Sequence, residues 1–427
     1  MNTQNQQLNN SADNSDNITD ALTLSLSTQT ITQPENNALF DNTPIASYVR
    51  QLINKAIDQL ASDIHFEPYE KSMRIRFRID GLLYHIDNLP IQSASQITAI
   101  LKIMAQCDVT EKRLPQDGRF KIAAYKQQAF DFRLNTCPTI YGEKVVVRLL
   151  NASKNILNVD LLGFEKQQQQ LFINAIHKPQ GMILVTGPTG SGKTVTLYSA
   201  LSILNRDHIN ISTVEDPVEI NLLGINQVNI NQKIGLHFAT ALRALLRQDP
   251  DIIMVGEIRD SETAEIALQA AQTGHLVFST LHTNNAAETL SRLISMGMAH
   301  YQIAASLTLI IAQRLARRLC THCKTPVNLS NNALKEMGII ESHFPTLNIY
   351  SAVGCDKCNN GYKGRIAIYE ILSVTPQINQ MILDGNHPVA IAQQAQSDGM
   401  ISLRQSGLKK VCEGITSIQE LDRVIKA

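Results

Sequence analysis

The chain has 427 residues, of which 44% are hydrophobic and 18% are charged, so it holds enough apolar material for two or three globular domains. Lys plus Arg and Asp plus Glu number 38 each, and the formal net charge of +0 excludes a surface built mainly to bind nucleic acid or anionic lipid. No apolar run approaches the roughly 18 residues of a transmembrane helix. A secretory signal requires basic residues near the N-terminus, and here the first basic residue is Arg50. We therefore expect a soluble, cytoplasmic protein without a disulfide framework.

Composition divides the chain into a tail and two predicted domains. Residues 1–42 are rich in Asn, Gln, Ser and Thr, and because they carry little apolar surface to offset the entropy of ordering we expect a disordered tail. Thr43-Pro44 predicts the start of a helix, and alternating strand patterns around an Asp80-Gly81 turn predict hairpins. Residues 43–150 are thus expected to form a small α/β N-terminal domain, followed by a linker over 151–160.

Residues 161–427 are predicted to form an α/β domain with a mostly parallel sheet covered by helices on both faces. The basis is the alternation of short, continuous apolar strands with helical stretches, which is typical of a fully buried sheet. Residues 318–365 interrupt the pattern as a cysteine-containing insert, and residues 375–427 are predicted as C-terminal helices. The predicted strands are Met182–Val185, Ile211–Val214, Ile252–Val255 and Leu276–Ser279.

The strongest motif lies between the first of these strands and a predicted helix, and matches the phosphate-binding pattern G-x-x-x-x-G-K-[ST]. Glycines in such a loop let backbone N–H groups surround phosphate oxygens at a helix N-terminus. Lys193 is predicted to neutralise the β- and γ-phosphates and Thr194 to hold Mg²⁺. A chance glycine-rich turn is the alternative, which the strand–loop–helix context disfavours. The predicted nucleotide-binding residues are Gly187, Pro188, Thr189, Gly190, Ser191, Gly192, Lys193 and Thr194.

Acidic residues close two further predicted strands. Glu257 ends one of them, where the Walker-B carboxylate of a P-loop protein contacts the Mg²⁺ shell. Three acids lie within residues 215–219, and because hydrolysis needs a group that orients the attacking water we predict Glu215 in that role. An ordinary strand end and a solvated acidic turn are the alternatives. His275 and His282 flank another strand, and either sense the γ-phosphate or are ordinary core or surface histidines.

Two C-x-x-C pairs predict a structural metal site. Four thiolates at this spacing suit tetrahedral Zn²⁺, with no position left open for catalysis. Free buried thiols and an iron–sulfur cluster are the alternatives. The predicted ligands are Cys320, Cys323, Cys355 and Cys358.

Together these motifs resemble the GspE/PulE/PilB family, the ATPases of bacterial type II secretion and type IV pilus assembly, from about residue 44 to the C-terminus. The loop and the acid and histidine segments resemble the RecA-like ATPase domain of that family, and the tetracysteine insert resembles its assembly members. The resemblance implies a homohexamer in which Arg119 and Arg133 approach the γ-phosphate bound by a neighbouring subunit; the alternative is that these arginines only pair with Asp117 or Asp131. Segments that resemble the family's second N-terminal domain are 61–68 (ASDIHFEP), 76–81 (RFRIDG), 113–119 (RLPQDGR) and 142–148 (GEKVVVR).

The predicted function is a cytoplasmic hexameric ATPase at the inner-membrane face. It hydrolyses ATP with Mg²⁺ to power assembly of pilin-like subunits, holds a structural Zn²⁺, and meets the membrane only through platform partners. The family's usual first N-terminal domain is expected to be replaced here by the tail. The alternatives are a nucleic-acid-translocating motor or zinc-knuckle binder, which needs a basic, aromatic-lined channel, and a nucleotide-binding regulator without turnover. Zero net charge, 5% aromatic residues and no Trp argue against nucleic acid, and Lys193, Glu215 and Glu257 argue against the regulator.

Overall fold

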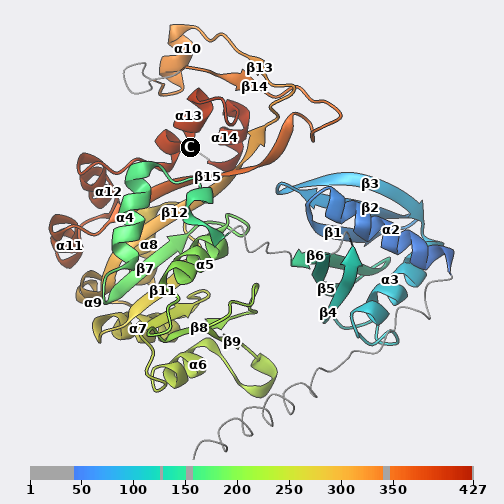
Figure 1. Cartoon of the computed structure of the whole chain (residues 1–427), viewed down its shortest axis with the longest axis horizontal. Coiled ribbons are helices and arrows are strands. Elements are labelled where there is room, and N and C mark those ends of the chain that lie inside the picture. The colour runs from blue at the N-terminus through green and yellow to red at the C-terminus, as the bar shows by residue number, and fades with distance from the viewer. Residues whose placement is uncertain (1–42, 126–127, 151–156, 340–346, 426–427) are drawn as a thin grey trace, which may run out of the picture.

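The computed structural model describes residues 43–125, 128–150, 157–339 and 347–425. Within them the chain forms two α/β bodies, each built on its own sheet (Figure 1). We call them the N-terminal body (43–150) and the C-terminal body (157–425). The predicted tail and residues 151–156 of the predicted linker lie outside the described residues. No helix in the described part of the chain is both long enough and apolar enough to cross a membrane.

The N-terminal body is a six-stranded antiparallel sheet in the order β3-β2-β1-β6-β5-β4, with both helices packed on one face. Its first helix begins as predicted, because the Thr43 hydroxyl accepts the backbone N–H of Ala46 at 3.2 Å and Pro44 follows. Apolar side chains on that face form one core, while charged side chains cover the other. The elements are α2 (Pro44–Asp58), β1 (Ala61–Pro68), β2 (Ser72–Ile79), β3 (Leu82–Pro90), α3 (Gln92–Met104), β4 (Gln116–Tyr125), β5 (Gln128–Thr139) and β6 (Gly142–Leu150).

The C-terminal body is a seven-stranded sheet in the order β15-β12-β7-β11-β10-β8-β9. All neighbouring strands are parallel except β12 and β15. The four predicted strands are present as β7 (Gly181–Thr186), β8 (Ile211–Glu215), β10 (Ile252–Val255) and β11 (Leu276–Leu281), and all four are fully buried. The predicted α/β fold with a mostly parallel sheet is thereby confirmed.

Helices and short strands complete the C-terminal body. Apolar clusters on the two faces of the sheet show that it is covered on both sides. The remaining elements are η2 (Val159–Leu161), α4 (Lys166–Ile176), α5 (Lys193–Leu204), β9 (Asn226–Asn229), η3 (Gln232–Ile234), α6 (Phe238–Leu245), α7 (Ser261–Gln272), α8 (Ala286–Ser295), α9 (His300–Ser306), β12 (Leu307–Leu319), β13 (Thr325–Pro326), α10 (Asn331–Glu336), β14 (Tyr350–Ser351), β15 (Tyr362–Ser373), α11 (Pro376–Leu383), α12 (Pro388–Ser397), α13 (Leu403–Cys412) and α14 (Ile418–Val424).

Two long strands, β12 and β15, were not predicted from the sequence. They pair antiparallel from Leu309 opposite Ser373 to Leu319 opposite Tyr362, and β12 also joins β7 in parallel. The tetracysteine insert connects them, so it projects from the end of this strand pair (Figure 1). The consequence for function is that β12 lies beside the strand that leads into the phosphate-binding loop.

Two buried glutamates fasten the C-terminal helices to the sheet. Glu370 of β15 accepts the first backbone N–H groups of α8 and α13 at 2.8 and 3.0 Å, and so caps both helices. Glu420 of α14 binds the Arg317 guanidinium of β12 at 2.8 Å. Burial alone would raise the pKa of Glu420, but hydrogen bonds from Arg423 and Arg317 lower it to about 2.

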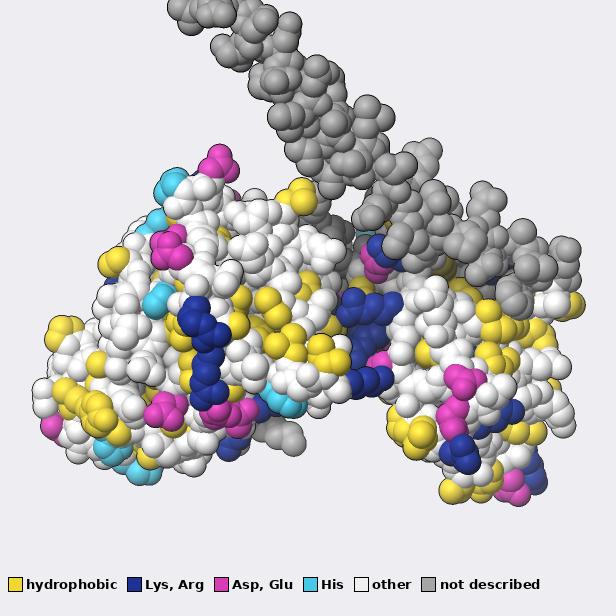
Figure 2. Space-filling model, turned by 90° about the horizontal axis from the view of Figure 1, so that it is seen from below, with side chains coloured by type: hydrophobic (Ala, Val, Ile, Leu, Met, Phe, Trp, Pro, Cys, Tyr) yellow, Lys and Arg dark blue, Asp and Glu magenta, His cyan; other side chains and the backbone are white. Residues whose placement is uncertain are grey.

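The two bodies contact each other through the β2–β3 turn. Asp80 in this turn accepts the backbone N–H of Gly364 at 2.8 Å, and its other oxygen lies 3.7 Å from Nε of Arg365. Both partners lie near the start of β15, at the C-terminal end of the predicted tetracysteine insert. Figure 2 shows basic side chains gathered where the N-terminal body faces the C-terminal body.

Candidate functional site

The phosphate-binding loop joins the carboxyl end of β7 to the start of α5. Gly187 has φ of +146°, and a Cβ there would lie 2.4 Å from the carbonyl oxygen of Gln313. Gly192, the residue before α5, has φ of +90°, in the left-handed region. Both positions therefore require glycine, one for space and one for backbone conformation.

Lys193 points back into this loop. Its ammonium donates hydrogen bonds to the carbonyls of Gly187 (2.8 Å) and Pro188 (3.2 Å), and its side chain is largely buried. The pKa of Lys193 is lowered to about 8, mainly by burial. The nearby charges have smaller effects on this pKa: Glu257 and Glu219 raise it, and Arg314 lowers it. The lysine is thus a poorly hydrated cation, which an anionic ligand in the loop would stabilise in its charged form.

The loop residues fit a nucleoside triphosphate. Ser191 Oγ is buried and has no hydrogen-bond partner among the described residues. A phosphate oxygen is an acceptor for this hydroxyl, for the N–H groups at the start of α5 and for the Lys193 ammonium. Thr194 lies half-buried in the first turn of α5, where its hydroxyl is available to a cation held by the phosphates.

Glu215, the predicted water-orienting acid, is held inside the fold. It ends β8, is 4% exposed, and accepts hydrogen bonds from Thr213 Oγ1 (2.6 Å), Gln227 Nε2 (3.3 Å) and the buried Tyr198 hydroxyl. Burial raises the pKa of Glu215, and the hydrogen bonds from Thr213, Tyr198 and Gln227 lower it. Both carboxylate oxygens are therefore engaged by the protein itself. The structure tests no catalytic role, and that role stays a prediction.

Glu257 and Glu219 are the carboxylates whose charge acts on Lys193. Glu257 follows β10, contacts the Arg259 guanidinium and lies 3.4 Å from Nε2 of His282. Glu219 lies four residues beyond β8 and is exposed. Two carboxylates at the carboxyl edge of the sheet, close to a phosphate-binding lysine, have the arrangement needed to hold Mg²⁺ and orient water.

The two predicted histidines lie at opposite ends of one strand. His282 follows β11 at the loop edge, whereas His275 precedes β11, where its Nδ1 contacts the Ala270 carbonyl at 3.0 Å and its own carbonyl accepts Gly181 N–H. A strand of six residues separates them by about 20 Å. His275 therefore lies away from the phosphate-binding loop of its own chain, because parallel strands bring only their carboxyl ends to that edge. A phosphate-sensing role for either histidine stays a prediction.

Three arginines form a row across the N-terminal sheet. Arg119 of β4 is the direct cross-strand neighbour of Arg133 of β5, which is in turn the neighbour of Arg148 of β6. Arg133 pairs with Asp117 at 3.1 Å and Arg148 with Asp63 at 2.8 Å, while Arg119 is exposed. The two predicted γ-phosphate arginines thus lie together on a surface of the N-terminal body.

Sequence reasoning missed Arg314 and Gln313 on β12. The Arg314 guanidinium is 8% exposed, donates to the carbonyl of Asn284 at 2.8 Å and lies beside Gly187. Gln313 accepts the Thr196 hydroxyl of α5 at 2.8 Å and so holds the helix that follows the loop. No local motif marks either residue, because their contacts depend on β12 pairing with β7.

The four predicted zinc ligands converge. Sγ–Sγ distances are 3.9 Å for Cys320–Cys355, 3.7 Å for Cys323–Cys358 and 3.6 Å for Cys355–Cys358. Zinc–sulfur bonds of about 2.3 Å in a tetrahedron place the sulfurs about 3.8 Å apart, whereas a disulfide needs about 2.05 Å. Backbone N–H groups also donate to Cys323 and Cys358 at 3.3 Å each, which stabilises thiolates. The cluster therefore fits a four-coordinate metal.

This fold and this loop define a RecA-like P-loop ATPase. A pilus retraction motor, PilT with bound ADP, superposes with a TM-score of 0.61 at 27% identity, covering 87% of this chain and 95% of that one. The ATPase DotB of Legionella pneumophila shares the fold at a TM-score of 0.66 and 20% identity, covering 88% of this chain and 95% of that one.

The chain belongs to the type II/IV secretion system protein family, whose model matches residues 38–423. It is 56% identical to the type IV pilus assembly ATPase PilB of Acinetobacter baylyi, over 90% of this chain and 67% of the relative. PilB of Pseudomonas aeruginosa is 54% identical, over 92% and 70%. The type II secretion system protein E of Pectobacterium carotovorum is 46% identical, over 90% and 76%.

These findings confirm the predicted family, the RecA-like ATPase fold with its tetracysteine insert, and the enzyme class. The chain is a secretion and pilus-type ATPase, which hydrolyses ATP. They favour this reading over a nucleic-acid motor or a zinc-knuckle binder.

Proposed function

We propose that the chain is the ATP-hydrolysing subunit of a homohexamer that drives assembly of pilin-like subunits in a type IV pilus or type II secretion machine. The observation that carries this proposal is a complete phosphate-binding edge on one sheet, with a row of arginines on a separate one. Relatives named as a pilus assembly ATPase and a secretion system protein support the client class. The ring docks from the cytoplasmic side on inner-membrane platform proteins, without nucleic acid and without inserting into the membrane itself.

ATP binding exchanges the internal contacts of the loop for contacts to phosphate. The Lys193 ammonium leaves the carbonyls of Gly187 and Pro188 for phosphate oxygens, and Ser191 Oγ gains the partner that it lacks. Thr194 and Glu257 are the residues that would hold Mg²⁺, which neutralises charge on the phosphate oxygens when bound. Because Lys193 is buried, water screens its charge only weakly, and the ammonium stabilises the negative charge of the transition state more strongly.

We place the water-orienting role on Glu219 in preference to Glu215, the residue chosen from the sequence. Glu219 is exposed and acts electrostatically on Lys193, whereas Glu215 already accepts three hydrogen bonds from its own fold. Glu215 then serves to fix the end of β8, from which the segment carrying Glu219 departs. His282 holds Glu257 from the side of β11.

The tetracysteine cluster serves as a structural zinc site. Cys320, Cys323, Cys355 and Cys358 would hold the ion, whose bonds close the insert between β12 and β15. All four positions are filled by thiolates, so the ion takes no part in hydrolysis.

Catalysis is shared between subunits, with Arg119 and Arg133 reaching the γ-phosphate held by a neighbour. A phosphate-facing arginine on a separate body stabilises developing charge only when the interface is closed, which couples nucleotide state to domain movement. The test is ATP turnover by purified protein. Turnover per chain should rise with concentration as rings form, and Lys193→Ala should abolish it.

A mixture of two inactive variants tests most directly whether the catalytic site is shared between subunits. Arg133→Ala and Lys193→Ala variants should each be inactive, and together regain activity, since one mixed interface has an intact loop facing an intact arginine. Lys121→Ala, a neighbouring exposed cation on β4, is the matched control and should remain active. Co-assembled but inactive mixtures, with turnover independent of concentration, would place the whole site within one chain.

A further inference from the structure

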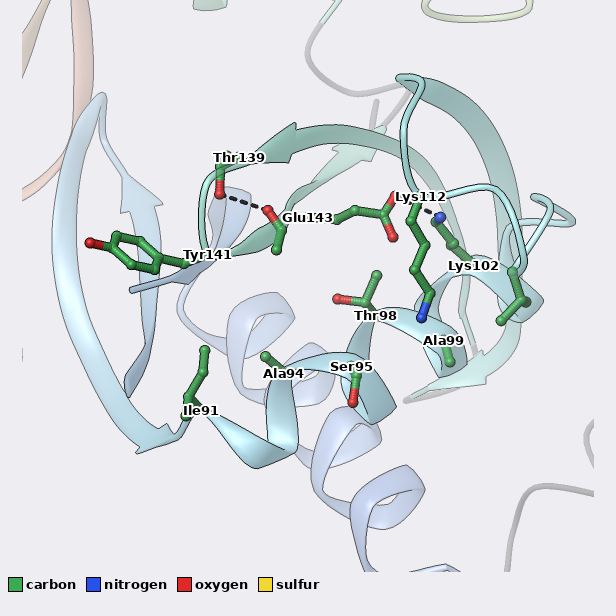
Figure 3. A pocket seen from close by; sticks show the side chains of 12 residues that line it. Ile91, Ala94, Ser95, Thr98, Ala99, Lys102, Lys112, Thr139, Tyr141 and Glu143 are labelled. Atoms are coloured by element: carbon green, nitrogen blue, oxygen red, sulfur yellow. Dashed lines mark hydrogen bonds and ion pairs between the residues drawn. The ribbon is translucent and has the colours of Figure 1, made fainter. Parts of the chain in front are cut away.

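The N-terminal body contains a pocket that includes no residue of the phosphate-binding loop. It lies between α3 and the tip of the β5–β6 hairpin and has a volume of about 280 Å³ (Figure 3). Ligand pockets generally begin at about 300 Å³, so this space suits a molecule smaller than a drug-sized ligand. Nothing in the proposed ATPase mechanism uses it.

A buried ion pair forms the floor of this pocket. The Lys102 ammonium lies 2.6 Å from Oε1 of Glu143 and donates a hydrogen bond to the Glu111 carbonyl at 2.7 Å. Lys102 is 1% exposed and Glu143 is 9% exposed. Glu143 Oε1 is enclosed against this ammonium, while the Glu143 side chain lines the pocket. The second carboxylate oxygen, Oε2, is the one that can accept hydrogen bonds from hydroxyl groups in the pocket.

A second ammonium stands over the same space. Lys112, in the segment that follows α3, extends across the pocket towards that helix (Figure 3). It is exposed, and within the described residues it makes no hydrogen bond and no ion pair. With Lys102 and Glu143 it gives the pocket a net charge of +1. The hydroxyl groups of Ser95 and Thr98 line the helix side.

The remaining walls are apolar or aromatic, formed by Ile91, which precedes α3, by Ala94 of α3 and by the ring of Tyr141. The structural role of the Lys102–Glu143 pair is to fasten the hairpin to α3. That role accounts for neither the unpaired Lys112 nor the hydroxyl groups gathered opposite it.

We propose that this pocket binds a small anion that carries hydroxyl groups, with the chemistry of a polyol phosphate. The anionic end lies at Lys112 and Ser95, and the hydroxyl groups donate to Glu143. A free metabolite and the headgroup of a glycerophospholipid share this chemistry, and the experiment below separates them. The site acts independently of the proposed hydrolysis of ATP.

The test is calorimetric titration with sn-glycerol 3-phosphate, using the full chain with Lys193→Ala to weaken phosphate binding at the loop. Saturable binding is expected, weakened about tenfold or more by Lys112→Ala, the scale of a lost hydrogen bond to a charged group. Lys121→Ala removes an exposed lysine of the same body that already pairs with Asp131, and should bind normally. Ser95→Ala should weaken binding without unfolding the chain, because Ser95 is exposed.

A parallel arm uses phosphatidylglycerol vesicles with phosphatidylcholine vesicles as control. Lys112-dependent binding to the charged vesicles, with none to the soluble phosphate, assigns the headgroup as the source of the ligand. Absence of binding to either probe up to about 10 mM, or equal binding by the Lys112→Ala chain, overturns the proposal. Lys112→Ala in the chain with native Lys193 should keep its ATP turnover, so failure here leaves the proposed function intact.

Discussion

Glu215→Gln and Glu219→Gln should separate a structural acid from a catalytic one. Glu219 is exposed at the loop edge, so the amide should leave the fold unchanged and lower turnover about 100-fold or more, the scale of a lost general base. ATP should still bind, because Lys193 and the loop are untouched.

Glu215→Gln should act mainly on stability. Three donors converge on two carboxylate oxygens, and an amide replaces one acceptor by an NH₂ group that faces a hydroxyl. Losing one hydrogen bond to a charged group costs about 2 kcal/mol. For a body of this size that corresponds to a melting temperature lower by roughly 4–8 °C. Turnover at 25 °C should fall far less than in Glu219→Gln.

The assay combines thermal unfolding with steady-state phosphate release, and nucleotide binding followed by a fluorescent ATP analogue. Thr213→Val is the matched control, since it removes one donor to Glu215 and should lower stability without abolishing turnover. The opposite result would be an inactive Glu215→Gln chain that melts like the native one, together with a Glu219→Gln chain that hydrolyses ATP normally. The acid chosen from the sequence would then be the correct one.

Four further outcomes are expected. Gly187→Ala should lose ATP binding in a filter-binding assay, because its Cβ would lie 2.4 Å from the Gln313 carbonyl. Gly190→Ala strains a backbone at φ of +79° but meets open space, and should therefore lose less binding. Elemental analysis should find about one zinc per chain, and Cys323→Ser should lower both zinc content and melting temperature. Because the pKa of Lys193 is about 8 and ATP binds the charged form, the Kd for ATP should rise as pH increases through 8. Ion pairs depress the pKa of Glu420 to about 2. The free energy of unfolding measured in urea should therefore fall by about 3 kcal/mol as pH falls from about 4.5 to 2, and Glu420→Gln should remove this contribution to the pH dependence.

The features readable from the sequence are those encoded in short contiguous segments. The loop that ends at Lys193 and Thr194, the four buried strands and the cysteine pairs each carry their signal within a few residues, because glycine conformation, apolar runs and ligand spacing are local properties. Helix starts were readable for the same reason at Thr43.

Tertiary structure alone decided which of these residues meet. Arg314 and Gln313 reach the loop only because β12 pairs with β7, a contact between segments more than a hundred residues apart. Strand direction placed His282 at the nucleotide edge and His275 at the other end, a distinction that two similar motifs do not carry. The choice between Glu215 and Glu219 likewise depends on Tyr198 and Gln227 closing around one of them. Local sequence determines which chemical groups are available, whereas the pairing of distant strands determines which of them share a site.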